Sequence, residues 1–203
     1  FSSANVLAVT LQTESLYPSD TARATFVRTV EDRLATIPGV AHTGVTTALP
    51  FAGAIGPKQS TFEIRGRPVG STRARPTVHT AAISPGYFGT LHIPLRDGRS
   101  FVTTDDAMHA KVAIVSAALA RQYWAAEKPI GQHIEVTLSG APAVYEIVGV
   151  VGDIHDVGLD QPPLPMLYLP YAQTPTGGVT FVVQTGTAPR AMLSRVRREM
   201  GAV

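Results

Sequence analysis

The segment Ser84–Phe101, SPGYFGTLHIPLRDGRSF, most constrains the fold, because it interrupts an otherwise strand-rich pattern. Ser84 is a good N-cap for a short helical turn beginning at Pro85, since proline fixes φ and needs no donor at a first helical position. Gly89 offers little packing surface. The adjacent aromatic pair, Tyr87 and Phe88, is therefore predicted to anchor the turn to a core. We interpret this segment as a hinge between two lobes.

A second turn signal follows at residues 96–99, where an Asp-Gly pair is flanked by two arginines. The glycine of this turn completes the set of residues that we assign to the hinge, which are Ser84, Pro85, Tyr87, Phe88 and Gly98. The acidic pair Asp105 and Asp106 comes soon afterwards. One of these carboxylates is expected to form a partly exposed ion pair with Arg96 or Arg99, worth about 0 to 1 kcal/mol.

The first eighty residues have the pattern of a strand, a helix and further strands. Asn5–Leu11 is short, apolar and β-branched, which is typical of a buried strand. Ser19 then begins a helix whose apolar residues recur at helical spacing up to Ile37. Val40–Leu49 predicts a second strand that closes a βαβ unit with right-handed parallel pairing. Thr61–Arg65 and Val78–Ile83 predict two more strands.

The second half of the chain begins with an apolar strand at Lys111–Val115, and Ser116 caps the helix that follows. Tyr145–Val151 is the most strongly β-like run in the sequence and is predicted to be central in a sheet. Val179–Thr185 resembles the early strands in its residues, and Pro189 lies at the start of a final amphipathic helix.

These patterns predict an α+β fold with two lobes, for which 203 residues are enough. A βαβ-type lobe would be formed by both chain ends, residues 1–84 and 166–203, which would share one sheet. A smaller mixed α/β lobe, residues 85–165, would be inserted between them. The chain would cross between the lobes in the segments Ser84–Phe101 and Asp156–Pro165.

The composition narrows the classes of function. No run of about 18 apolar residues is present, and no signal peptide is visible, so nothing in the sequence predicts a membrane span. The missing initiator Met suggests an excised segment or a mature form. The absence of cysteine excludes disulfides and thiolate chemistry but leaves the compartment open. The net charge is only +2, and the arginines of the last helix are interpreted as a solvated face, so no nucleic-acid partner is expected.

Two candidates for catalysis or metal binding compete with structural roles. The first is the cluster Asp153, His155, Asp156 and Asp160, whose oxygen and imidazole groups are possible metal ligands, although Asp and Gly after a strand are also typical of turns. The second is Ser116, which lacks the glycines of a hydrolase nucleophile motif and is interpreted as an N-cap. We therefore expect no catalytic residue, no metal and no cofactor.

Several short blocks carry a resemblance to a known family. They are the hinge segment at 84–101, the pair Leu49-Pro50, VAIVSAALARQYW at 112–124, the pair Ile130-Gly131, YEIVGVVGDI at 145–154 and LYLPY at 167–171. Each block is weak alone, but they occur in the family's order and cover nearly the whole chain. In this respect the chain resembles the extracytoplasmic core domain of MacB-like and FtsX-like ABC transporter permeases.

The resemblance implies a porter lobe made from the two chain ends and a smaller inserted lobe. It also implies an extracytoplasmic position at the cell inner membrane, on the periplasmic side, in a protein that takes part in transport such as efflux. Such domains usually continue past the last helix into another strand, whereas this sequence stops at Val203, so an open sheet edge is expected there. The family pattern places one transmembrane helix before Phe1 and three after Val203.

The expected partners follow from the same resemblance. They are the transmembrane helices of the same permease, a cytoplasmic ATP-binding subunit or domain, and a second permease protomer or a periplasmic adaptor. The sequence itself contains no P-loop motif. Two other functions stay open: a stand-alone periplasmic module that binds a small ligand or lipid between the lobes, and a hydrolase.

Overall fold

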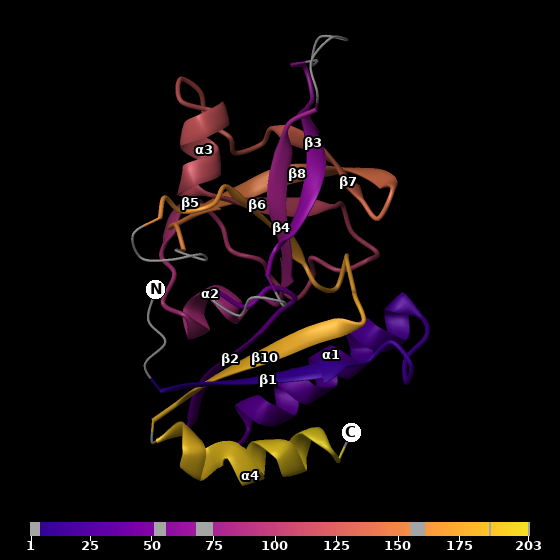
Figure 1. Ribbon diagram of the computed structural model, residues 1–203, viewed down its shortest axis with the longest axis vertical. Coiled ribbons are helices and arrows are strands. Elements are labelled where there is room, and N and C mark those ends of the chain that lie inside the picture. Colours follow the sequence, from indigo (N-terminus) through magenta and orange to yellow (C-terminus); the bar gives the residue numbers. More distant parts are fainter. Residues whose placement is uncertain (1–4, 51–55, 68–74, 155–160, 187, 203) are drawn as a thin grey trace.

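The computed structural model describes residues 5–50, 56–67, 75–154, 161–186 and 188–202, and it shows a mixed α+β fold in which strands dominate (Figure 1). The described residues form the strands β1 (Val6–Gln12), β2 (Val40–Thr46), β3 (Lys58–Ile64), β4 (Thr77–Ile83), β5 (Leu95–Gly98), β6 (Val112–Ser116), β7 (His133–Leu138), β8 (Ala141–Val151), β9 (Met166–Pro170) and β10 (Gly178–Thr185), and the helices α1 (Asp20–Ala35), α2 (Tyr87–Thr90), α3 (Ala117–Tyr123) and α4 (Pro189–Met200).

Strands from both chain ends form one end of the sheet, in the order β1, β10, β2, which we call the three-stranded unit. β10 is antiparallel to both neighbours, so β1 and β2 run in the same direction on either side of it. The predicted direct pairing of β1 with β2 is therefore wrong. A βαβ connection leaves room for one strand between its two strands, and here that strand comes from the far end of the chain.

Two helices cover one face of the three-stranded unit. Alternate residues of β10, including Phe181 and Val183, pack against Val30 and Leu34 of α1 and against Val196 of α4. Ser19 caps α1 as predicted, since its hydroxyl accepts a hydrogen bond from the N–H of Ala22. In Figure 1 the two helices lie at the end of the molecule opposite to α3.

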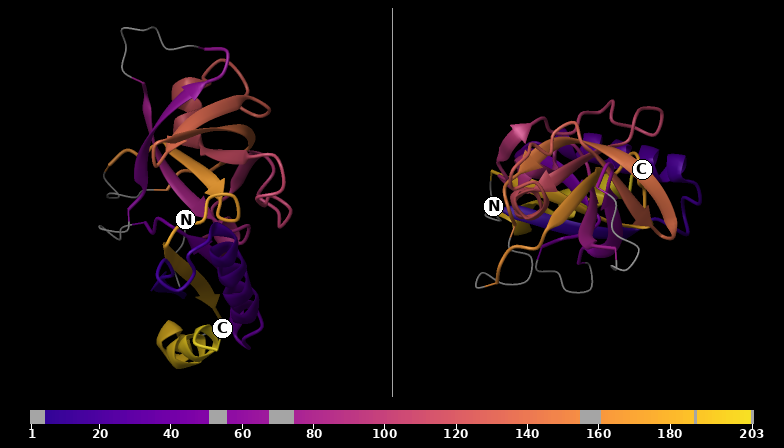
Figure 2. Two further views of the ribbon diagram at one scale, coloured as in Figure 1. Left: turned by 90° about the vertical axis from the view of Figure 1, so that its right-hand side faces the viewer. Right: turned by 90° about the horizontal axis from the view of Figure 1, so that it is seen from above.

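The other strands close into a ring in the order β4, β3, β7, β8, β6, β9, because β9 pairs in parallel with β4. We call these six strands the strand ring. β8 is central, as predicted, since β7 and β5 pair along one edge and β6 pairs along the other. Figure 2 shows the strand ring stacked on the three-stranded unit along the long axis of the molecule.

Some strand pairs run across the predicted division of the chain. That division places β3, β4 and β9 with the chain ends, whereas β3 pairs with β7 and β9 pairs with β6 in the strand ring. The residue pattern of a strand cannot predict its pairing partner, because a half-buried strand has the same alternation of residues whichever neighbour it pairs with. None of the described helices combines the length and the apolar character needed to cross a membrane.

Candidate functional site

The three-stranded unit and the strand ring meet at the short helix α2. β2 and β4 pair briefly at Thr46 and Ile83, with a backbone hydrogen bond on either side, and α2 follows directly after β4. A buried cluster at this junction includes Phe88 of α2, Tyr168 of the strand ring and Val182 of β10. Val182 points away from α1 and α4, so α2 packs on the opposite face of the three-stranded unit.

The aromatic pair anchors this junction, as the sequence predicts. Tyr87 is 1% exposed and Phe88 is 4% exposed. The ring of Phe88 meets the ring of Tyr168 edge to face, with centroids 5.0 Å apart, which is a favourable geometry for aromatic pairs. The aromatic side chains of α2 therefore contact the strand ring directly.

Two glycines allow α2 to lie against β2. A Cβ atom built on Gly86 would lie 2.1 Å from the carbonyl oxygen of Thr43, and one built on Gly44 would lie 2.6 Å from the Cα of Tyr87. Real Cβ atoms do not approach other atoms so closely. The backbones of α2 and β2 are in contact here because both positions lack a side chain.

Ser84 does not cap α2, which corrects the prediction. The helix begins at Tyr87 with Gly86 as its N-cap, and no side chain bonds to the free N–H groups. The hydroxyl of Ser84 instead donates to Oε1 of Glu31 at 2.7 Å and accepts from the N–H of Val45 at 2.9 Å. One hydroxyl thus joins α1, β2 and the end of β4.

Glu31 is a functional candidate that the sequence analysis missed. Burial raises the pKa of its carboxyl group to about 7, against a lowering by the Ser84 hydrogen bond and a smaller rise from the nearby charge of Asp32. A signal was available, because Glu31 follows Val27 by four residues and precedes Leu34 by three. It therefore lies beside the apolar stripe of α1.

The remaining predicted hinge residues lie in two places. Pro85 is exposed beside α2. Gly98 is in β5 and pairs with Gly149 of β8, so it lies beside the strand ring and not at the junction. Its φ of +72° and the 2.2 Å that would separate an added Cβ from the carbonyl oxygen of Val148 both require glycine.

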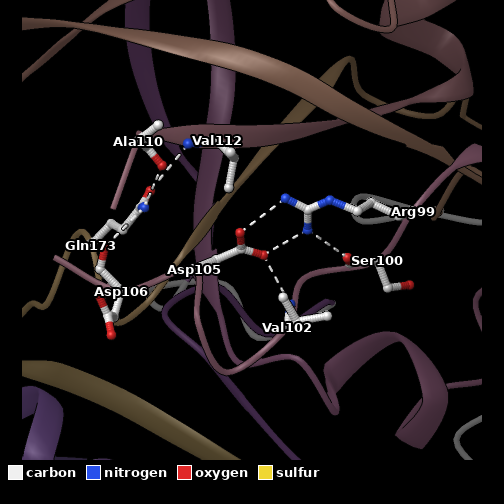
Figure 3. Close-up of polar contacts among 8 residues, drawn as sticks. All are labelled: Arg99, Ser100, Val102, Asp105, Asp106, Ala110, Val112 and Gln173. Carbon is white, nitrogen blue, oxygen red and sulfur yellow. Dashed lines mark hydrogen bonds and ion pairs between the residues drawn. The ribbon is translucent and has the colours of Figure 1, made fainter. Parts of the chain in front are cut away.

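Asp105 orders the loop between β5 and β6, as Figure 3 shows. Its two oxygens accept hydrogen bonds from Arg99 at 2.8 and 3.0 Å, and one also accepts from the N–H of Val102 at 2.9 Å. Burial raises the pKa of Asp105, but these hydrogen bonds lower it more, so the pKa lies below its ordinary value. The predicted ion pair with Arg99 is confirmed.

Gln173 holds the other end of the same loop (Figure 3). Its amide nitrogen donates to the carbonyl oxygens of Asp106 and Ala110, and its amide oxygen accepts from the N–H of Val112. The loop is therefore fixed at both ends by buried side chains.

A groove of about 580 Å³ runs between α1 and this loop, with Glu31 and Ser84 among its lining residues. About half of its lining residues are apolar, namely Ala24, Val27, Ala35, Ile83, Pro85, Val102, Ala107, Met108, Pro170, Tyr171, Ala172 and Pro175. Five carboxylates and one cationic side chain also line it, namely Asp20, Glu31, Asp32, Asp105, Asp106 and Arg28. The groove lies beside the junction and has one wall from the three-stranded unit with its helices and one from the strand ring with its loops.

The two candidates for catalysis or metal binding, Ser116 and the cluster that begins at Asp153, have structural roles among the described residues. The Ser116 hydroxyl accepts from the N–H of Leu119, which confirms the N-cap, and also from the N–H of Met166. Asp153 accepts from the N–H of Ala118 and from Arg121. The other members of its cluster, His155, Asp156 and Asp160, lie outside the described residues. Within the described ranges, no three His, Asp or Glu side chains gather as metal ligands would.

Solved structures of transporter domains share this fold. The periplasmic region of MacB from Actinobacillus actinomycetemcomitans superposes with a TM-score of 0.60 and 14% identity, over 98% of this chain and 84% of that one. The extracellular domain of the noncanonic ABC-type transporter YknZ from Gram-positive bacteria gives 0.55 and 18%, over 85% and 79%. A domain of a putative permease from Porphyromonas gingivalis gives 0.50 and 16%, over 81% and 72%. The fold is thus similar to the folds of these three transporter domains.

The family follows from the sequence itself. The model of the MacB-like periplasmic core domain matches residues 1–199, so the chain belongs to that family. A search of the curated proteins with this chain found no match. The resemblance carried by the short sequence blocks is confirmed.

Proposed function

We propose that this chain is the extracytoplasmic domain of a MacB-type ABC transporter permease in the cell inner membrane, and that it relays ATP-driven motion of the membrane helices. Family membership supports the extracytoplasmic position. The proposal gives the chain a mechanical role and no catalytic one. ATP would be hydrolysed by a separate cytoplasmic subunit or domain, because the sequence has no P-loop.

The observation that carries the proposal is the position of the two ends of the described chain. β1 begins at Val6 and α4 ends at Met200, and both elements belong to the three-stranded unit and its helices. Membrane helices attached at the two ends would therefore pull on the same unit. The strand ring would follow through the junction at α2 and through the two segments that connect the units, residues 47–57 and 171–177.

We propose that the three-stranded unit and the strand ring move as two lobes. Their limits follow the strand pairing, so β1, α1, β2, β10 and α4 form one lobe, and β3 to β9 with α3 form the other. The hinge would be Ser84, Pro85, Tyr87 and Phe88, beside the short pairing of β2 with β4. A narrow connection between packed units can absorb rotation while each unit keeps its core.

The partners in this proposal are the permease's own transmembrane helices and its ATP-binding subunit or domain. The strand ring would contact a second protomer or a periplasmic adaptor. The intact gene provides the first test, because it must encode one membrane helix before Phe1 and three after Val203. A reading frame without these helices would favour the stand-alone binding module.

The motion itself is measured with spin labels in the intact permease, since this chain has no cysteine of its own. Labels at Arg28→Cys on α1 and Gln122→Cys on α3 report on the two lobes, and both positions are exposed. We expect ATP to shift their distance distribution. A control pair within one lobe, Arg28→Cys with Arg195→Cys, should not change. Equal behaviour of the two pairs would contradict the relay.

A further inference from the structure

The groove between α1 and the loop at residues 102–108 has the size and lining of a small-molecule site. Its volume of about 580 Å³ lies within the usual range for such sites, and about half of its lining side chains are apolar. Met108, at its rim, is 89% exposed, and Val102 is 47% exposed. Exposed apolar side chains beside a concave surface favour contact with an apolar ligand.

The carboxylates of the groove differ in whether they have a basic partner. Four of the five have a basic partner, in the pairs Asp20 with Arg23, Asp32 with Arg28, Asp105 with Arg99, and Asp106 with His109. Glu31 has none among the described residues, and its hydrogen-bond partner there is the neutral hydroxyl of Ser84. The Ser84 contact uses Oε1, so Oε2 has no donor within the part of the chain that the structure describes.

Glu31 is half-buried, and a carboxylate that is partly removed from water without a cation costs stability. Unpaired carboxylates of this kind are found where a bound ligand supplies the missing positive charge. A protonated amine would supply both this charge and the N–H donors. We propose that this groove binds a small amphipathic molecule that carries a primary ammonium group, with its nitrogen at Glu31 and its apolar body against Ala24, Val102 and Met108.

The charged groups around the site predict how binding depends on pH. Asp20, Arg28 and Asp32 face the groove from α1, and Asp105 and Asp106 face it from the opposite loop with their partners Arg99 and His109. From the segment after β9 the groove is lined by Tyr171, whose pKa burial raises to about 12, so it stays neutral. Glu31, with a pKa of about 7, changes charge between pH 6 and pH 8.

The test uses octylamine as the probe and octan-1-ol as its uncharged control, with binding to the 203-residue chain measured by calorimetry. We expect octylamine to bind about tenfold more tightly than the alcohol at pH 8, and about tenfold more tightly at pH 8 than at pH 6. Equal affinities for the two probes, or the absence of octylamine binding at millimolar concentration, would overturn the proposal.

Two variants locate the site. Glu31→Gln keeps the shape of the side chain and should lose about tenfold in octylamine affinity together with the pH dependence. Glu199→Gln removes the same charge from α4, outside the groove, where its carboxylate pairs with Arg198, so affinity should stay within about twofold. An equal loss in both variants would show a general charge effect and would overturn the site.

A third variant keeps the proposal testable if Glu31→Gln is poorly folded. Ala24→Leu narrows the groove with a good helix former and changes no charge. It should weaken octylamine and octan-1-ol alike, by about fivefold or more. Unchanged affinity for both would place the probe elsewhere. The inference does not rest on the relay, because binding is measured without membrane helices or ATP.

Discussion

The hydroxyl of Ser84 gives the junction a polar centre. It receives the N–H of β2 and donates to a carboxylate of α1. Position 84 therefore links the end of β4 to β2 and to α1, and the N–H of Val45 and the carboxylate of Glu31 would each lose a partner if the hydroxyl were removed. A buried donor or acceptor left without a partner costs about 1 to 3 kcal/mol.

Glu31 gives a prediction at the same scale. Its pKa is about 7 in the folded chain and 4.5 as an ordinary value, so the folded state binds more protons between these limits. The free energy of unfolding should therefore be highest below about pH 4.5 for this group and should fall by about 3 kcal/mol as the pH rises past 7. The loss comes from a carboxylate that must stay charged while buried.

Urea unfolding at pH 5, 6, 7 and 8 measures this effect. Glu31→Gln should remove most of the fall and should be more stable than the wild type at pH 8. Glu199→Gln, on α4 and outside the groove, should keep the pH dependence of the wild type. A Glu31→Gln curve parallel to that of the wild type would contradict the assignment.

At the scale of elements, α2 is positioned by the lack of side chains at two facing positions. Gly86 has φ of −76° and ψ of −13°, which any residue can adopt, so space and not backbone conformation requires glycine there. The contact between α2 and β2 therefore depends on how closely the backbone at Gly86 can approach the carbonyl oxygen of Thr43.

We expect Gly86→Ala to lower the free energy of unfolding by about 2 kcal/mol or more, because the added Cβ would force α2 away from Thr43. Gly89→Ala is the matched control in the same helix, where an added Cβ would meet nothing within 4 Å. That change should be neutral or stabilising by up to about 1 kcal/mol. Thermal unfolding of both variants is the measurement, and similar losses in both would count against the close approach.

The elements that the sequence predicts correctly are those with local signals. The cap at Ser19, the cap at Ser116 and the apolar run of β8 each follow from neighbouring residues. The pairings are not predictable in this way, because the insertion of β10 between β1 and β2 depends on residues far apart in the chain.

The candidate site also combines features that local sequence signals predict with features that depend on distant residues. The burial of Tyr87 and Phe88 could be predicted, since two adjacent aromatic side chains beside glycines must find a core. The contact between Ser84 and Glu31 joins residues 53 positions apart, and no local pattern indicates it. The turn signal at Gly98 predicts a change of chain direction, but that signal does not show which strand lies opposite.

At the scale of the whole molecule, Phe88 tests the link between the proposed lobes. Phe88→Leu loosens the junction while keeping an apolar side chain, at a cost of about 1.5 kcal/mol. In the intact permease we expect ATP hydrolysis to continue while the ATP-driven change in distance between labels on α1 and α3 becomes smaller. Phe62→Leu, in the core of the strand ring, is the control for general destabilisation. It should leave the distance change intact, and a change of equal size in both variants would argue against a hinge at α2.

The position of β10 between β1 and β2 also determines the order in which the chain can fold as it is made. All strands of the ring are complete once Pro170 has been synthesised, whereas β1 and β2 have no strand between them until Thr185 has followed. The strands and helix at the start of the chain must therefore wait for a strand close to its end. The strand ring can therefore reach its native structure first, and the three-stranded unit is completed afterwards.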